Sequence, residues 1–278
     1  MKTLKRQTLI YDKDCPLCRA YTAGFVKTGM LDENGRLPYT DLNTDTCAFV
    51  DANRARNEIA LIDHKNKTVT YGIDSLLKVL GHSIPFIEKV GKTKPLYSVL
   101  KRLYSFISYN RKVIIPSAKN ETETQCVPDF NLKYRIAYIL FGGIITALVL
   151  FRYSQLMNYG RAIFPFFAEL IFAFGQIPFQ WIVLRKETRE TQFEYFGNLI
   201  TASVFGSLLL TLGIIANTII NIPPEPHTLW FLITATIMFF EHLRRVELLQ
   251  LPVKLCISWL SYRFLLLLAV VLYISITK

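Results

Sequence analysis

Two cysteines three positions apart, Cys15 and Cys18, are the residues of this sequence best suited to chemistry. They follow a short apolar run, and Pro16 between them favours the first turn of a helix. Thiols with this spacing lie about one turn apart on one helix face, within the separation that a disulfide needs. A helix N-terminus favours negative charge, which lowers the pKa of a thiol and makes it a nucleophile. We therefore expect Cys15 to attack a substrate disulfide and Cys18 to resolve the mixed disulfide.

Three charged residues precede the pair, and their effects on it differ in sign. Lys13 would stabilise a thiolate at Cys15, whereas Asp12 and Asp14 would oppose it if they lay close. One of these aspartates would instead cap the helix, or accept the proton of Cys18 if burial raised the pKa of that carboxyl. The sequence leaves these roles of Asp12 and Asp14 open.

Two alternatives to a redox role exist for the pair: the cysteines could form half of a zinc site, or they could have no chemical role. A zinc site would need two further ligands. The candidates outside the apolar half are Cys47, Cys126, His64 and His82, which form no second CxxC or HxxxH pattern. We therefore expect no metal. Cys256 falls in an apolar block, and five scattered cysteines without a signal-peptide pattern do not indicate a structural disulfide framework.

The elements that must position the pair follow from the spacing of apolar residues. Pro38 places the second predicted strand near a sheet edge. The predicted helix 73–80 is expected to end at Gly81. The order of strand, CxxC, helix, strand, helix, hairpin and helix predicts an α/β domain of thioredoxin type. The predicted strands are 8–11, 37–42, 58–63 and 68–71, the last two forming a hairpin, and the predicted helices are 16–29, 44–55, 73–80, 83–90 and 95–109.

The segment Tyr11–Cys18, after a short strand, resembles the signature of the DCC-type thiol-disulfide oxidoreductase family. The segments Leu103–Arg111 and Cys126–Pro128 resemble two later family motifs, so the resemblance covers residues 8–128. It implies a thioredoxin-like fold and a redox activity at the two motif cysteines. The sequence departs from thioredoxins at Asn57-Glu58, where they place a cis-proline, which leaves the mode of substrate docking open.

The second half of the chain is made of apolar blocks, and it raises the hydrophobic content to 51%. A polar linker at 117–129 separates a predicted redox domain of residues 1–128 from a predicted all-α transmembrane domain of residues 129–278. Because a span needs about 20 residues, we count five spans, with four as the alternative. The blocks are Ile136–Phe151, Ala162–Leu184, Phe196–Ile220, Leu229–Phe240 and Leu255–Ile276.

Charges between these blocks predict the orientation of the protein. The loops on the side of the N-terminal domain carry eight basic residues, against three on the other side, which by the positive-inside rule predicts a cytoplasmic N-terminal domain. We expect a multi-pass protein of a bacterial inner membrane. The net charge of +11 suits anionic lipid better than nucleic acid, because no helix-turn-helix, zinc finger or basic tract is present. The expected partners are the lipid bilayer and a protein or small-molecule thiol or disulfide substrate, with no nucleic acid.

Ionisable residues inside the apolar blocks are candidates for function because burying them in a membrane is costly. Glu169 and Arg263 would pair with each other or line a polar cavity. Pro165 and Pro178 predict a kinked helix that opens space for a ligand such as a quinone or a lipid. The cluster Glu241–Arg245 is expected to be a charge cap at the end of a span.

The sequence thus supports a membrane-tethered thiol-disulfide oxidoreductase whose redox-active disulfide joins Cys15 and Cys18. The alternative is a redox-sensing or metal-binding accessory domain. Such a domain would regulate an activity of the membrane half, such as transport or quinone-linked electron transfer.

Overall fold

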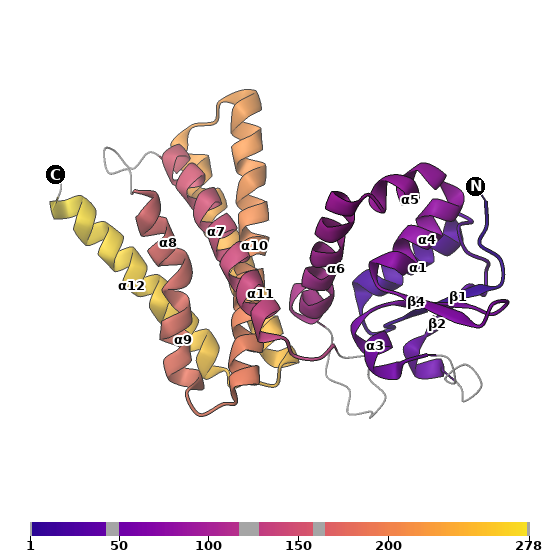
Figure 1. The fold of residues 1–278 in the computed structure, drawn as a ribbon. Helices are drawn as coiled ribbons and strands as arrows, with labels where there is room; N and C mark the ends of the chain where they lie inside the picture. The colour runs from indigo at the N-terminus through magenta and orange to yellow at the C-terminus, as the bar shows by residue number, and fades with distance from the viewer. Residues whose placement is uncertain (1, 43–49, 117–127, 158–164, 277–278) are drawn as a thin grey trace. The chain divides into compact units, whose positions relative to one another are not determined.

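The computed structural model describes residues 2–42, 50–116, 128–157 and 165–276. The chain divides into two compact units, which we call the N-terminal unit (residues 1–134) and the helical unit (residues 135–278). The first is a small α/β unit, and the second consists of helices (Figure 1).

A four-stranded mixed sheet forms the centre of the N-terminal unit, with the strand order β2-β1-β3-β4. Strand β1 runs parallel to β2 and antiparallel to β3, and β3 pairs with β4 as an antiparallel hairpin. Leu9 and Ile10 of β1 are buried on opposite faces, as expected of a central strand. The strands are β1 (Gln7–Tyr11), β2 (Arg36–Pro38), β3 (Ala60–Asp63) and β4 (Thr68–Tyr71).

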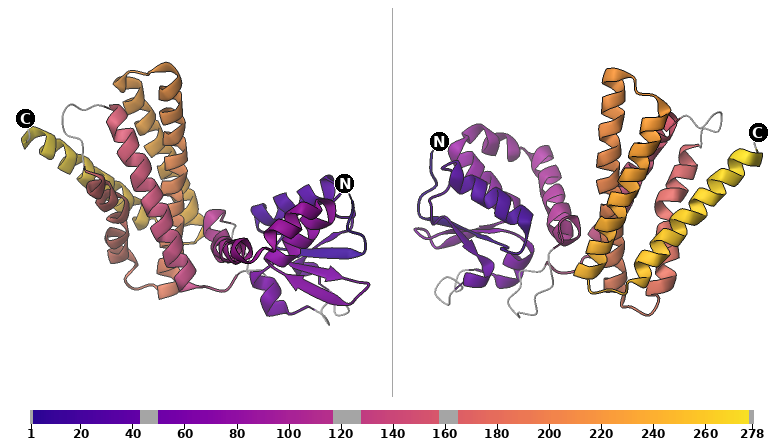
Figure 2. Two further views of the ribbon diagram at one scale, coloured as in Figure 1. Left: turned by 45° about the horizontal axis from the view of Figure 1, so that its top comes forward. Right: turned by 180° about the vertical axis from the view of Figure 1, so that it is seen from behind.

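Helices cover both faces of this sheet (Figure 1, Figure 2). One face packs Leu9 and Leu61 against apolar residues of α1, α4 and α6. The other face packs Ile10 and Ile62 against Ala55 of α3. The helices are α1 (Pro16–Lys27), α3 (Ala52–Asn57), α4 (Ile73–Ser83), α5 (Pro85–Gly91) and α6 (Lys94–Ile114), with a 3-10 turn at Tyr39–Asp41.

Several predicted boundaries in this unit are wrong: the helix predicted at 95–109 continues to Ile114, and the strand predicted at 58–63 begins at Ala60. Two further errors have a clear physical cause. Strand β2 ends at Pro38 instead of reaching residue 42, because proline has no N–H to continue the ladder. Helix α4 continues past Gly81 to Ser83. That glycine is buried, and a Cβ there would lie 2.3 Å from the Cβ of Glu88 in α5, so it permits close helix packing rather than ending the helix. The predicted helix 44–55 falls partly outside the described residues.

Among its described residues, the helical unit contains four segments long and apolar enough to cross a membrane: α7, α8 with α9, α10 and α12. Helix α11 coincides with the remaining predicted block but is less apolar than these four. The described helices are α7 (Leu132–Met157), α8 (Phe166–Phe174), α9 (Gln176–Leu184), α10 (Arg189–Ile220), α11 (Pro224–Leu248) and α12 (Lys254–Ile276).

The predicted interruption of the second apolar block lies at Gly175, between α8 and α9. Pro178 explains the position, because it lacks the N–H that would otherwise bond to the carbonyl of Phe174. Pro165 precedes the first residue of α8. The block is therefore interrupted at Gly175, as predicted, while α8 and α9 together are still long enough to cross a membrane.

Candidate functional site

Cys15 and Cys18 lie at the start of α1, directly after the loop that leaves the central strand β1. Cys15 is the N-cap residue, and Pro16 occupies the first helical turn. Both thiols are free, and the side chain of Cys18 donates a hydrogen bond to that of Cys15. Cys15 is completely buried and Cys18 is 6% exposed, so a large substrate reaches the sulfur of Cys15 only if the surrounding chain moves.

The two thiols have opposite pKa shifts. The hydrogen bond from Cys18 lowers the pKa of Cys15 from 9.0 to about 6, with a further contribution from the positive charge of Arg111, although burial and Asp12 act in the other direction. The pKa of Cys18 is raised, first because its thiol donates to Cys15 and then because it is buried. The pair therefore holds one proton, on Cys18, over a broad pH range, and Cys15 carries the negative charge.

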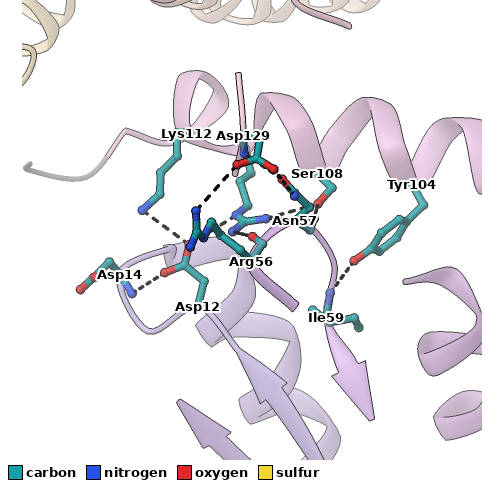
Figure 3. Close-up of polar contacts among 10 residues, drawn as sticks. Asp12, Asp14, Arg56, Asn57, Ile59, Tyr104, Ser108, Lys112 and Asp129 are labelled. Carbon is teal, nitrogen blue, oxygen red and sulfur yellow. Dashed lines mark hydrogen bonds and ion pairs between the residues drawn. The ribbon is translucent and has the colours of Figure 1, made fainter. Parts of the chain in front are cut away.

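Asp12 is the centre of a buried ion-pair cluster (Figure 3), and its charge acts on Cys15. Its Oδ2 atom lies 3.3 Å from Nε of Arg111 and 3.5 Å from Nζ of Lys112. Its Oδ1 atom accepts a hydrogen bond of 3.0 Å from the backbone N–H of Asp14. The side chains of Asp12 and Arg111 are only 2% and 7% exposed, so each charge depends on the other for compensation.

Arg111 also joins the end of α6 to the segment that precedes β3. Its guanidinium donates to the carbonyl oxygens of Asn57 and Arg56, at 3.4 and 2.9 Å, and to the hydroxyl of Ser108 at 3.3 Å. The Ser108 hydroxyl itself donates to the carbonyl oxygen of Asn57. One side chain thus holds the β1–α1 loop, the approach to β3 and the last turns of α6 together.

Two tyrosines complete the surroundings of the pair. The hydroxyl of Tyr104 in α6 accepts a hydrogen bond of 2.9 Å from the backbone N–H of Ile59 (Figure 3), and burial raises its pKa to about 12. Tyr21, one turn after Cys18, is hydrogen-bonded to the Cys18 sulfur, and burial raises its pKa well above the usual value. Both phenols are therefore neutral hydrogen-bonding groups near physiological pH.

The structure brings only some of the residues expected near the cysteines into the roles predicted for them. Neither Asp12 nor Asp14 is the N-cap of α1, because Cys15 occupies that position, so the capping role is wrong. Lys13 is exposed, and the cation that lowers the pKa of Cys15 is Arg111, from a segment almost a hundred residues away. Arg111 belonged to the Leu103–Arg111 resemblance, which was the signal that could have identified it.

The further metal-ligand candidates fall in different places. Within the described ranges, no group of three or more His, Cys, Asp or Glu residues could hold a metal ion. Cys47 and Cys126 lie outside the described residues. His64 bonds to Thr8 and His82 to the carbonyl oxygen of Thr3, at the end of the sheet away from the cysteines.

Glu169 and Arg263 in the helical unit do not form the expected ion pair in the described part of the chain. Glu169 of α8 is buried close to Ser154 of α7. The guanidinium of Arg263 lies 4.8 Å from the ring centroid of Trp259, one turn earlier in α12. Cys256 is packed in the core of the unit.

The segment Glu241–Arg245 is more deeply buried than a charge cap would be. Glu241 bonds to both Arg244 and Arg245, but Arg245 is buried and donates to Asn198 of α10 at 2.8 Å. His242 is also buried; it bonds to Tyr195 of α10 at 2.9 Å and stacks on Trp259. These side chains therefore join α10, α11 and α12, in addition to carrying charge.

Comparisons with protein-family models, with curated proteins and with solved structures found no significant match to this chain.

Proposed function

We propose that the N-terminal unit is a thioredoxin-like thiol-disulfide oxidoreductase, held at the cytoplasmic face of a membrane by the helical unit. The observation that carries the proposal is the pair of opposite pKa shifts at Cys15 and Cys18, which makes one thiol a nucleophile and keeps the other protonated. The strand order β2-β1-β3-β4, with the pair at the start of α1 directly after β1, supports the thioredoxin-like interpretation.

In the proposed reaction the Cys15 thiolate attacks one sulfur of a substrate disulfide. A new sulfur–sulfur bond joins Cys15 to the substrate, and the substrate disulfide breaks. The substrate sulfur that leaves in this step departs as a thiolate and takes a proton from water. Cys18 then attacks the sulfur of Cys15, and its own proton goes to the second substrate sulfur as that sulfur leaves Cys15. This second step releases the substrate as a dithiol and leaves a Cys15–Cys18 disulfide. An external dithiol returns the pair to its reduced form, so that in each cycle two electrons and one proton pass through the pair, and the second proton is exchanged with water.

The Asp12–Arg111 pair positions the thiolate in this proposal. Arg111 stabilises the negative charge of Cys15, and Asp12 opposes it, so the lowered pKa is a balance between the two. Asp12 also accepts the N–H of Asp14 and thereby fixes the loop that carries Cys15. Asp12 and Asp14 are therefore positioning residues in the proposal. The segment before β3 is held by Arg111 rather than by a cis-proline, since the described residues contain no cis peptide bond.

Helix α11 contributes to the proposed membrane topology. It is hydrogen-bonded to α10 near both of its own ends. His227 of α11 bonds to Asn217 of α10, and Arg245 of α11 bonds to Asn198 of α10. About 19 residues of α10 separate these contacts, which corresponds to about 28 Å of helix, close to the thickness of a bilayer core. We propose that α11 crosses with α10, that the chain crosses five times, and that the loop charges place the N-terminal unit in the cytoplasm of a bacterium.

The complete burial of Cys15 favours a second candidate function, that of a redox sensor. A small oxidant reaches a buried thiolate more easily than a folded protein does. In that case formation of the Cys15–Cys18 disulfide changes the activity of the helical unit, and no substrate is turned over.

The test is a reduction-potential and turnover measurement on the full chain in detergent. The reduced protein is equilibrated with glutathione redox buffers, and the state of Cys15 and Cys18 is read by thiol trapping and mass spectrometry. We expect a reversible disulfide with a potential in the range of about −120 to −270 mV of known oxidoreductases. With Cys18→Ser we expect a trapped mixed disulfide at Cys15.

The outcomes separate the two candidates. Turnover of a protein or small-molecule disulfide that Cys15→Ser abolishes supports the enzyme. A reversible disulfide without turnover of either class supports the sensor. If Cys15 and Cys18 form no reversible disulfide, both candidates are wrong.

A further inference from the structure

Helix α6 has an apolar stripe that the N-terminal unit does not cover. Val99 is 60% exposed, Leu103 50%, Ile107 38% and Leu96 37%. Their spacing of three or four residues places them on one side of the helix. A row of four aliphatic side chains on a helix that otherwise packs on a sheet indicates a surface that contacts something apolar.

The charge of the same helix is entirely positive. Helix α6 carries five basic residues and no acidic one, and Lys94, Lys101 and Arg102 are exposed along it. At about 100° per residue, Arg102 flanks the apolar stripe, whereas Lys94 and Lys101 lie about 160–180° from Leu103, on the polar side of the helix. Basic residues on the polar side attract a helix to anionic lipid while its apolar stripe enters the boundary of the acyl chains. A basic amphipathic helix of this kind is complementary to an anionic bilayer surface.

The chain itself ties α6 to the place where the protein enters the membrane. Asn110, in the last turns of α6, donates to the carbonyl oxygen of Tyr134 at 3.1 Å, and the rings of Tyr109 and Tyr134 stack with centroids 5.0 Å apart. Tyr134 lies in the first turn of α7, the first candidate span. Asp129, three residues before α7, is bonded to Asn57 at 2.6 and 2.8 Å. One end of α6 is therefore held against the first turn of α7.

We propose that α6 is an interfacial helix, which binds anionic lipid of the bilayer through Leu96, Val99, Leu103 and Ile107. The attachment to α7 keeps this surface beside the bilayer, so the stripe does not need the affinity of a free peripheral protein. The apolar side chains enter the boundary between headgroups and acyl chains, and Arg102 beside them contacts the phosphates. Lys94 and Lys101, on the polar side of the helix, attract the anionic surface over a longer range, within a Debye length of about 10 Å. This binding is independent of the redox chemistry proposed above.

The test uses the full chain in lipid nanodiscs with a tryptophan placed on the stripe, Leu103→Trp. The matched control, Ser98→Trp, is exposed on the same helix but rotated by about 140° from position 103. The discs contain either phosphatidylcholine alone or equal parts of phosphatidylcholine and phosphatidylglycerol, with acyl chains brominated in a parallel set. Subtracting the wild-type spectrum removes the three native tryptophans.

We expect the added tryptophan at position 103 to emit at shorter wavelength and to lose intensity to brominated lipid, most strongly in the discs with phosphatidylglycerol. The Ser98→Trp tryptophan should show neither effect. Adding Lys101→Glu and Arg102→Glu to Leu103→Trp should reduce the quenching in anionic discs.

Three results would overturn the proposal. Emission at short wavelength without quenching means that protein, from the helical unit or a second copy, covers the stripe. Emission at long wavelength without quenching means that the stripe faces water. Equal quenching in both kinds of disc removes the assignment to anionic lipid.

Discussion

The buried pair of Asp12 and Arg111 yields the sharpest quantitative prediction. At 3.3 Å, two unit charges attract each other by about 5 kcal/mol at an effective dielectric constant of about 20. Desolvation offsets most of this attraction, but removing one partner leaves the other charge buried, which costs about 3–5 kcal/mol. Lys112 remains 3.5 Å from Asp12, so we expect Arg111→Met to lower the free energy of unfolding of the N-terminal unit by about 3 kcal/mol.

Pulse proteolysis of the full chain in detergent, across a urea series, measures this loss, because the protease cleaves only the unfolded N-terminal unit. Lys112→Met is the matched control, since it removes the more exposed cation from the same carboxylate, and it should cost about 1 kcal/mol. The double variant Asp12→Asn with Arg111→Met should be more stable than the sum of the two single losses predicts, because neither charge is left alone. An Arg111→Met variant as stable as the wild type, or strictly additive losses, would show that the pair is not a buried ion pair.

Three further predictions address the thiolate, a hydrogen bond and helix packing. The pKa of Cys15 is about 6 in the folded protein and 9.0 when unperturbed, so deprotonation of Cys15 stabilises the folded, reduced protein progressively from pH 6 to pH 9. The unfolding midpoint should therefore rise over this pH range. The Cys15→Ser variant should show a smaller rise. Tyr104→Phe leaves the backbone N–H of Ile59 without its acceptor and should cost about 1–3 kcal/mol by the same proteolysis assay. In the helical unit, a Cβ at Gly143 would lie 2.2 Å from the ring of Phe174, so Gly143→Ala should lower the thermal midpoint of that unit by the equivalent of about 1–3 kcal/mol. In α1 of the N-terminal unit a Cβ at Gly24 meets nothing within 4 Å, so Gly24→Ala should leave the midpoint of its own unit unchanged or raise it. Equal effects of the two glycine substitutions would contradict the packing argument.

Local features of the N-terminal unit could be predicted because short-range patterns determine them. A short apolar run predicted β1, two short strand-like segments around a polar turn predicted the β3–β4 hairpin, and Pro16 marked the start of α1. The long apolar blocks likewise predicted membrane-spanning helices, since four of the five coincide with segments that can cross a bilayer.

The features that sequence reasoning missed depend on contacts between distant segments. Gly81 has the appearance of a helix end, but its role is to admit Glu88 from α5. The cation that acts on Cys15 is Arg111 rather than the adjacent Lys13, which only the packing of α6 on the sheet decides. Arg263 stacks on Trp259 instead of pairing with Glu169, because proximity in a helical bundle does not follow from shared burial.

The bond between Asp12 and Arg111 spans 99 positions in the chain, and this has a consequence for the order of events during synthesis. At roughly 5–20 residues per second, Arg111 is made about 5–20 s after Asp12. Until α6 has been made and has packed on the sheet, Cys15 lacks the positive charge that helps to hold its thiolate, and the nascent chain presents a more ordinary thiol. The reactive form of the pair is completed only as α7, the first candidate span, follows from the ribosome. The thiol pair thus matures together with the membrane attachment of the chain.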